Sequence, residues 1–155
     1  MSMDVGTLLV RESVRELLGG YVHHMDRGRT EEFLELFAED GVWEIVSDGF
    51  DGGRFAGRDA IRSHLESMKT ASTDDVPLRH HVTSVRVWVD GPGEARADAY
   101  FTAFTTTDGP DHWGRYRDRV VEDGDRWRFA QRSVIHEGRV PGGWLERRNA
   151  AAVAR

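Results

Sequence analysis

The 155-residue chain contains no cysteine, which excludes disulfide scaffolds, thiol catalysis and zinc sites built on thiolates. It has no long apolar run, and its mean hydropathy of −0.56 argues against a membrane-spanning segment. A net charge of −6 leaves no basic footprint for nucleic acid or an anionic membrane. Residues Met1 to Thr7 lack the basic and apolar regions of a secretory signal. We therefore expect a soluble cytoplasmic protein without a nucleic-acid or membrane partner.

Several motifs that bind nucleotides or create nucleophiles are also missing. The chain has no glycine-rich phosphate loop, no dinucleotide fingerprint and no nucleophile elbow. His23, His24 and Asp26 are close in sequence, but their spacing does not form a metal motif on one helix face. We expect no cofactor and no metal site.

Hydrophobic periodicity predicts three helices in the first half of the chain. A helical stripe runs through residues 7–25, with apolar side chains three, four, seven or eight positions apart. Thr30 is a suitable cap for a second helix, which carries Phe33 and Phe37 on its apolar side and ends near Gly41. Asp59 is a suitable cap for a third helix.

Alternating apolar residues and glycine-rich turns predict strands in the remainder. The expected strands cover residues 42–46, 54–56, 79–89, 95–106, 112–121 and 126–135. The tight turns between the last four indicate consecutive hairpins. The fold class is therefore α+β: three helices against one face of a curved, mixed or mainly antiparallel sheet, forming a cone with a cavity. Residues 1–143 form one domain, and residues 144–155 form a tail or short helix suited to a subunit contact.

Candidate site residues lie next to the apolar core segments. Asp26 follows the stripe of the first helix and faces either the cavity or the surface. Tyr21 lies five residues earlier, about 140° around the helix, so both reach one cavity only if it wraps the helix end. A histidine oriented by a carboxylate is the minimal general-base unit, which makes His80 and His81 the candidate partners of Asp26.

Strand alternation gives a first ranking of these candidates. His81 shares its alternation set with Val85 and Val87, so the pattern favours His81 as the histidine that faces the core. Arg132 shares its set with Arg128, so alternation exposes it unless a bulge reverses the register.

Several segments resemble the SnoaL-like branch of the NTF2-like superfamily, over about residues 8 to 135. The segments are Tyr21-Val22-His23-His24-Met25-Asp26, Phe33-Leu34-Glu35-Leu36-Phe37-Ala38-Glu39-Asp40-Gly41-Val42-Trp43, Gly57-Arg58-Asp59-Ala60-Ile61, Arg79-His80-His81-Val82-Thr83-Ser84, Gly114-Arg115-Tyr116-Arg117-Asp118 and Trp127-Arg128-Phe129. The resemblance implies the NTF2-like cone. Within the branch, the chain is similar to scytalone dehydratase, bile-acid 7α-dehydratase and hexachlorocyclohexane dehydrochlorinase, which are cofactor-free lyases with a His–Asp pair.

The resemblance also assigns roles to residues. It implies that His80, rather than His81, is the base and that Asp26 orients it, with His81 kept as second choice. Tyr21 and Arg132 would polarise a carbonyl or assist the leaving group. The expected pocket residues are His81, Tyr100, Trp43 and Phe55, with Tyr100 at the position of a second histidine in scytalone dehydratase.

The implied function is β-elimination from a small cyclic hydrophobic substrate, by a dehydratase or dehydrohalogenase of secondary metabolism. A polyketide-type cyclase or isomerase would use the same acid–base pair. A non-catalytic ligand-binding protein on the same cone would have Asp26 and His80 apart, or a cavity filled by Trp43, Phe55 or Tyr100. The resemblance implies a homo-oligomer, with a trimer favoured over a dimer.

Overall fold

The computed structural model describes residues 4–47, 52–71 and 77–153. The helices are α1 Val5–Asp26, α2 Thr30–Glu35, α3 Arg58–Ala71 and α4 Trp144–Val153. The strands are β1 Phe37–Val46, β2 Gly53–Ala56, β3 Leu78–Gly91, β4 Glu94–Thr105, β5 Gly109–Asp123 and β6 Arg126–Arg139. They form one sheet in the order β2-β1-β6-β5-β4-β3, in which β1 and β6 are parallel and all other neighbours are antiparallel.

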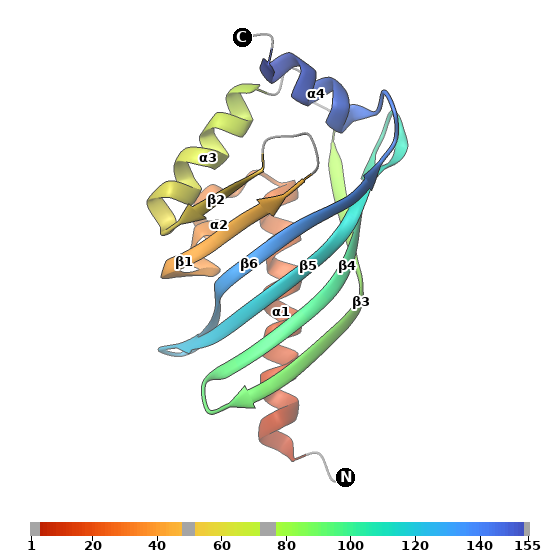
Figure 1. Ribbon diagram of the computed structural model, residues 1–155. Coiled ribbons are helices and arrows are strands. Elements are labelled where there is room, and N and C mark those ends of the chain that lie inside the picture. The colour runs from red at the N-terminus through yellow and green to blue at the C-terminus, as the bar shows by residue number, and fades with distance from the viewer. Residues whose placement is uncertain (1–3, 48–51, 72–76, 154–155) are drawn as a thin grey trace.

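The expected α+β class is confirmed, with the sheet curving around the helices. Figure 1 shows α1 running behind the long strands, while α3 and α4 lie near one end of the sheet. The N-terminus of α1 lies at the opposite end. The helices α3 and α4 therefore cover the end of the curved sheet that lies opposite the start of α1.

Three local expectations need correction. Phe37 begins β1 instead of extending α2, because it pairs with Phe129 of β6. Thr30 is the first residue of α2 and not its cap, and its hydroxyl accepts a hydrogen bond from Lys69 Nζ at 2.7 Å. Asp59 lies in the first turn of α3, which begins at Arg58.

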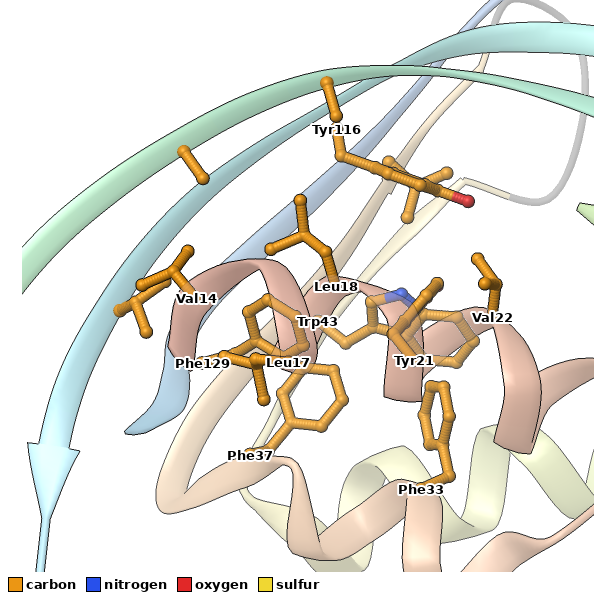
Figure 2. Packing of buried hydrophobic residues seen from close by; sticks show 14 of the residues in the cluster. Val14, Leu17, Leu18, Tyr21, Val22, Phe33, Phe37, Trp43, Tyr116 and Phe129 are labelled. Atoms are coloured by element: carbon orange, nitrogen blue, oxygen red, sulfur yellow. The ribbon is translucent and has the colours of Figure 1, made fainter. Parts of the chain in front are cut away.

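The core consists mainly of side chains from α1, α2 and the inner face of the sheet. Val14, Leu18, Phe33 and Phe129 are each at most 1% exposed. Figure 2 shows Tyr21 in the same cluster, and its ring centroid lies 5.0 Å from that of Phe33. Full burial of such side chains contributes about 1.5–3 kcal/mol each, so this cluster holds α1 firmly against the sheet.

A bulge at Ser84 changes which residues of β3 face the core. Between the pairs Thr83–Tyr100 and Arg86–Asp98, β3 contains one more residue than β4. Ser84 takes a positive φ of 53° at this point. Before the bulge the even-numbered side chains face inward, and after it the odd-numbered ones do. His80 and Val87 therefore share the inner face, although simple alternation separates them.

A second bulge acts in the same way on β6. Arg119 pairs with Gln131 and Val120 with Phe129, which leaves Ala130 as the extra residue. Phe129 and Arg132 consequently both point inward and are fully buried. Simple alternation would expose Arg132, and this reversal of the register is what buries it.

Ser84 offers a direct test of the bulge in β3. Because its side chain is exposed, substitution changes mainly the backbone preference. We expect Ser84→Val to lower the free energy of unfolding by about 1–2 kcal/mol, since a β-branched residue is strained at positive φ. Ser84→Gly, the matched control, should be at least as stable as the unmodified protein in urea unfolding. Equal stability of the valine and glycine variants would contradict the bulge.

Candidate active site

A cavity of about 370 Å³ lies between the sheet and the adjoining ends of α1, α3 and α4. Its apolar wall includes Phe33, Trp43, Leu65, Phe101, Val134 and Leu145. Its polar wall groups include Tyr21, His24, Asp26, His80, His112 and His136. A mainly apolar pocket with a few convergent polar groups is typical of a small-molecule site.

Asp26 and His80 meet in the wall of this cavity. Asp26 is the last residue of α1, and His80 lies near the start of β3. One carboxylate oxygen, Asp26 Oδ1, lies 2.5 Å from His80 Nδ1, and the other accepts a hydrogen bond from the His80 backbone N–H at 2.9 Å. Their side chains are only 8% and 12% exposed. The two bonds fix both the position and the ring orientation of the histidine.

The same geometry assigns the tautomer of His80. A carboxylate can only accept a hydrogen bond, so in the neutral ring the proton is on Nδ1. No hydrogen bond from the described residues engages Nε2, while the His80 ring lines the cavity. The arrangement therefore leaves Nε2 as the basic, unengaged nitrogen of a ring that lines the cavity.

Tyr21 and Trp43 also line the cavity. The cavity extends around the end of α1 as far as Thr30. Tyr21 and Asp26 therefore both line it, although they lie on different faces of the helix. Burial raises the pKa of the Tyr21 phenol well above its usual value, although the nearby Arg132 opposes the shift. Tyr21 is consequently a neutral hydroxyl that can donate a hydrogen bond at physiological pH.

Arg132 is close to these groups but is not a wall residue. It is fully buried and forms a two-pronged ion pair with Asp118, with both nitrogen–oxygen distances at 2.8 Å. Its guanidinium carbon lies 4.0 Å from the ring centroid of Tyr21 and 4.1 Å from that of Tyr116. Direct contact with a substrate, as the resemblance implies, does not fit this position. Arg132 instead supports the two tyrosine rings from behind.

Three expected pocket residues lie elsewhere. His81 is exposed on the outer face of the sheet, where its ring packs against Phe104. Tyr100 is 57% exposed and also faces outward, because Phe101 takes the inward position in β4. Phe55 packs behind Trp43 and stacks on His64. Of the site residues predicted from the sequence, Tyr21, Asp26, His80 and Trp43 are the ones that line this cavity.

His112 and Asp111, near the start of β5, were not predicted from the sequence, although His112 lines the cavity. His112 Nδ1 lies 2.7 Å from Asp111 Oδ2, and both residues are buried. Asp111 falls at a register shift between Ala103 and Phe104 of β4, inside a segment that reads as a loop. The available signal was an adjacent Asp-His pair at the expected start of a strand.

His136 of β6 adds a third imidazole to this wall. Its ring centroid lies 5.4 Å from that of His112. Burial, together with the neighbouring His112 and His80, lowers the pKa of His136 to about 4. Burial also lowers the pKa of His112, despite the opposing effect of Asp111. In the described residues, no three carboxylate or imidazole side chains are arranged as a metal site.

Over residues 6–133 the sequence matches the SnoaL-like domain. The chain belongs to the SnoaL-like family. One relative in sequence is the anthranilate 1,2-dioxygenase small subunit of Burkholderia cepacia. The two are 26% identical over 129 residues, which cover 76% of this chain and 80% of that subunit.

Solved structures share the SnoaL-like fold. A Novosphingobium aromaticivorans protein provisionally named scytalone dehydratase is 26% identical, with a TM-score of 0.69 over 86% of this chain and 87% of that one. A Catenulispora acidiphila protein in complex with S-DNPA is 28% identical, with a TM-score of 0.70 over 83% and 94% of the two chains. In the described part of the SnoaL-like chain, no helix is long and apolar enough to cross a membrane.

The partly buried His136 predicts a specific acid sensitivity. Its pKa of about 4 in the folded state lies below the value of about 6.5 for an unfolded chain, so the unfolded state binds more protons between these values. Stability is therefore complete above pH ~6.5 and falls as the pH drops towards 4, by up to about 3 kcal/mol. In urea unfolding between pH 7 and pH 4, the free energy of unfolding should fall less for His136→Phe than for the unmodified protein. His81→Phe, a control at an exposed position, should lose as much free energy of unfolding as the unmodified protein. An equal dependence on pH for all three proteins would contradict the lowered pKa of His136.

Proposed function

We propose that this protein is a cofactor-free lyase of the dehydratase or dehydrohalogenase type. It would act on a small cyclic hydrophobic substrate, with His80 as the general base and Asp26 as its orienting carboxylate. The observation that carries the proposal is the 2.5 Å contact between His80 Nδ1 and Asp26 Oδ1 in the cavity wall. A binding protein of this fold does not need an imidazole held in one tautomer with its second nitrogen directed at the ligand.

The pair has the features that proton abstraction from carbon requires. The carboxylate stabilises the imidazolium that forms when Nε2 accepts the proton. Both side chains are largely shielded from water, which strengthens their electrostatic interaction. The neutral hydroxyl of Tyr21, in the same cavity, would donate a hydrogen bond to the carbonyl oxygen of an enolising substrate.

The relatives support this class of reaction without defining the substrate. The provisional scytalone dehydratase is named for an elimination reaction, and it shares the fold over most of both chains. A polyketide-type cyclase or isomerase remains the alternative enzyme, because it would begin with the same proton abstraction and differ in the product. The size and apolar wall of the cavity suit either activity on a small ring.

A second candidate function is assembly with another chain. The relative from Burkholderia cepacia is a small subunit of a dioxygenase. On the outer face of the sheet, Tyr100 is 57% and Trp113 is 40% exposed, and such exposed aromatic residues are enriched in protein interfaces. This face would serve a homo-oligomer, with a trimer favoured, as well as a different partner. If the protein is a purely structural subunit, it catalyses no reaction and His80 is not a catalytic residue.

A small test substrate probes the lyase directly. From the 3-chloro derivative of indan-1-one, His80 would remove a C2 proton and chloride would leave from C3, giving inden-1-one. We expect His80→Gln to lower kcat/KM by about 10²–10⁴, the usual contribution of a placed general base. His81→Gln is the matched control, because His81 is exposed on the outer face, and it should keep full activity.

Formation of inden-1-one is followed by its absorbance, with the rate in buffer subtracted. Equal rates for the unmodified protein and His80→Gln would contradict the proposed base. Exchange of the C2 protons of indan-1-one with deuterated water, without elimination from the chloro compound, would favour the cyclase or isomerase.

A further inference from the structure

The cavity contains a second carboxylate-oriented histidine. His112 donates from Nδ1 to Asp111, as His80 does to Asp26, and the two contacts measure 2.7 Å and 2.5 Å. The imidazole centroids of His80 and His112 lie 5.8 Å apart, with the rings nearly perpendicular at 74°. Both rings line the cavity, and no hydrogen bond from the described residues engages the Nε2 of either.

Asp111 is held in place by the start of α4. Its carboxylate accepts hydrogen bonds from the backbone N–H groups of Trp144 at 2.6 Å and Leu145 at 3.2 Å. A Cβ at position 143 would lie 2.5 Å from Asp111 Oδ1, so the close approach requires Gly143. Burial tends to raise the pKa of Asp111, but the hydrogen bond and charge of His112 and the two amides outweigh it and lower the pKa. The carboxylate is therefore ionised and orients His112.

This arrangement distinguishes His112 from the other histidines of the wall. His24 and His136 also line the cavity, but the Nδ1 atom of each is buried without a hydrogen-bond partner among the described residues. The hydrogen bonds to the start of α4 explain why an aspartate stands at position 111. They do not explain why its carboxylate also contacts the imidazole of His112. The combination of an oriented ring, a cavity-facing edge and a neighbouring base points to proton transfer.

We propose that Asp111 and His112 form a second proton-transfer site, in which His112 donates a proton to the leaving group while His80 removes one from carbon. This proposal rests on the lyase function proposed above and adds a catalytic residue to it. In each cycle the C–H electron pair becomes the new C=C bond, and the carbon–oxygen bond breaks towards oxygen. The proton on His112 Nε2 converts the departing hydroxide into water, and the substrate proton remains on His80 Nε2. Proton exchange between the rings or with water then restores the starting state.

The charges around the two rings favour a single shared proton. Burial is the main cause that lowers the pKa of His112, the hydrogen bond and charge of Asp111 raise this pKa, and positive charges on His80 and on Arg148 of α4 lower it further. Asp26 of α1 contacts the His80 ring directly, and His24 of α1 lines the same cavity. Because two protonated imidazoles repel each other at this separation, the pair with one proton provides an acid and a base together.

The test compares two leaving groups on one ring system. Hydroxide requires protonation as it leaves the 3-hydroxy derivative of indan-1-one, whereas chloride leaves the 3-chloro derivative unaided. We expect His112→Gln to lower kcat/KM about 10²–10⁴-fold for the hydroxy compound and less than about tenfold for the chloro compound. His136→Gln, the matched control in the same wall, should affect the two substrates equally. An equal loss for both substrates in His112→Gln, or no loss for either, would overturn the proposal.

A substrate-independent measurement separates this proposal from the lyase function. In NMR titrations of the histidine rings, His80→Gln should move the pKa of His112 to a higher value because a neighbouring positive charge is removed. Asp111→Asn should move it lower. If the unmodified protein turns over neither indanone, the lyase proposal fails with these substrates, and the titration still decides whether the two rings interact. A His112 titration that neither variant changes would overturn the shared-proton site.

Discussion

Two hydrogen bonds from His80 to Asp26 join the end of α1 to the start of β3, across 54 residues of sequence. The backbone bond fixes the strand, and the ring bond fixes the imidazole. One wall of the cavity depends on this junction, because the lining residue Tyr21 belongs to the same helix and the lining residue Leu78 to the same strand. In this chain one carboxylate thus both joins α1 to β3 and orients the His80 ring.

Behind the cavity wall, a fully buried ion pair supports the aromatic residues. Arg132 and Asp118 neutralise each other, and the guanidinium lies beside the rings of Tyr21 and Tyr116. Removal of one partner from such a pair leaves an uncompensated charge, which typically costs about 3–5 kcal/mol. Arg132 therefore contributes to the site by supporting its walls and not by touching a substrate.

The sequence predicted the elements well but not the side chains that bulges redirect. Periodicity located α1, α3 and the long strands, since apolar spacing is a property of each segment alone. Ser84 and Ala130 are extra residues in β3 and β6, and each reverses which side chains of its strand face inward. The alternation pattern does not reveal such a reversal, so it favoured His81 and placed Arg132 on the exposed face. The resemblance identified Asp26 and His80 as the pair that meets. It did not identify His112, whose carboxylate partner lies in a segment that reads as a loop.

The central claim is that Asp26 holds His80 as a base with its free nitrogen in the cavity. The most direct test is the tautomer of His80, measured by long-range proton–nitrogen correlation spectra of protein with ¹⁵N-labelled histidine, at a pH where the ring is neutral. We expect the proton on Nδ1, with Nε2 unprotonated, and loss of this preference in Asp26→Asn. A proton on Nε2 in the unmodified protein would contradict it.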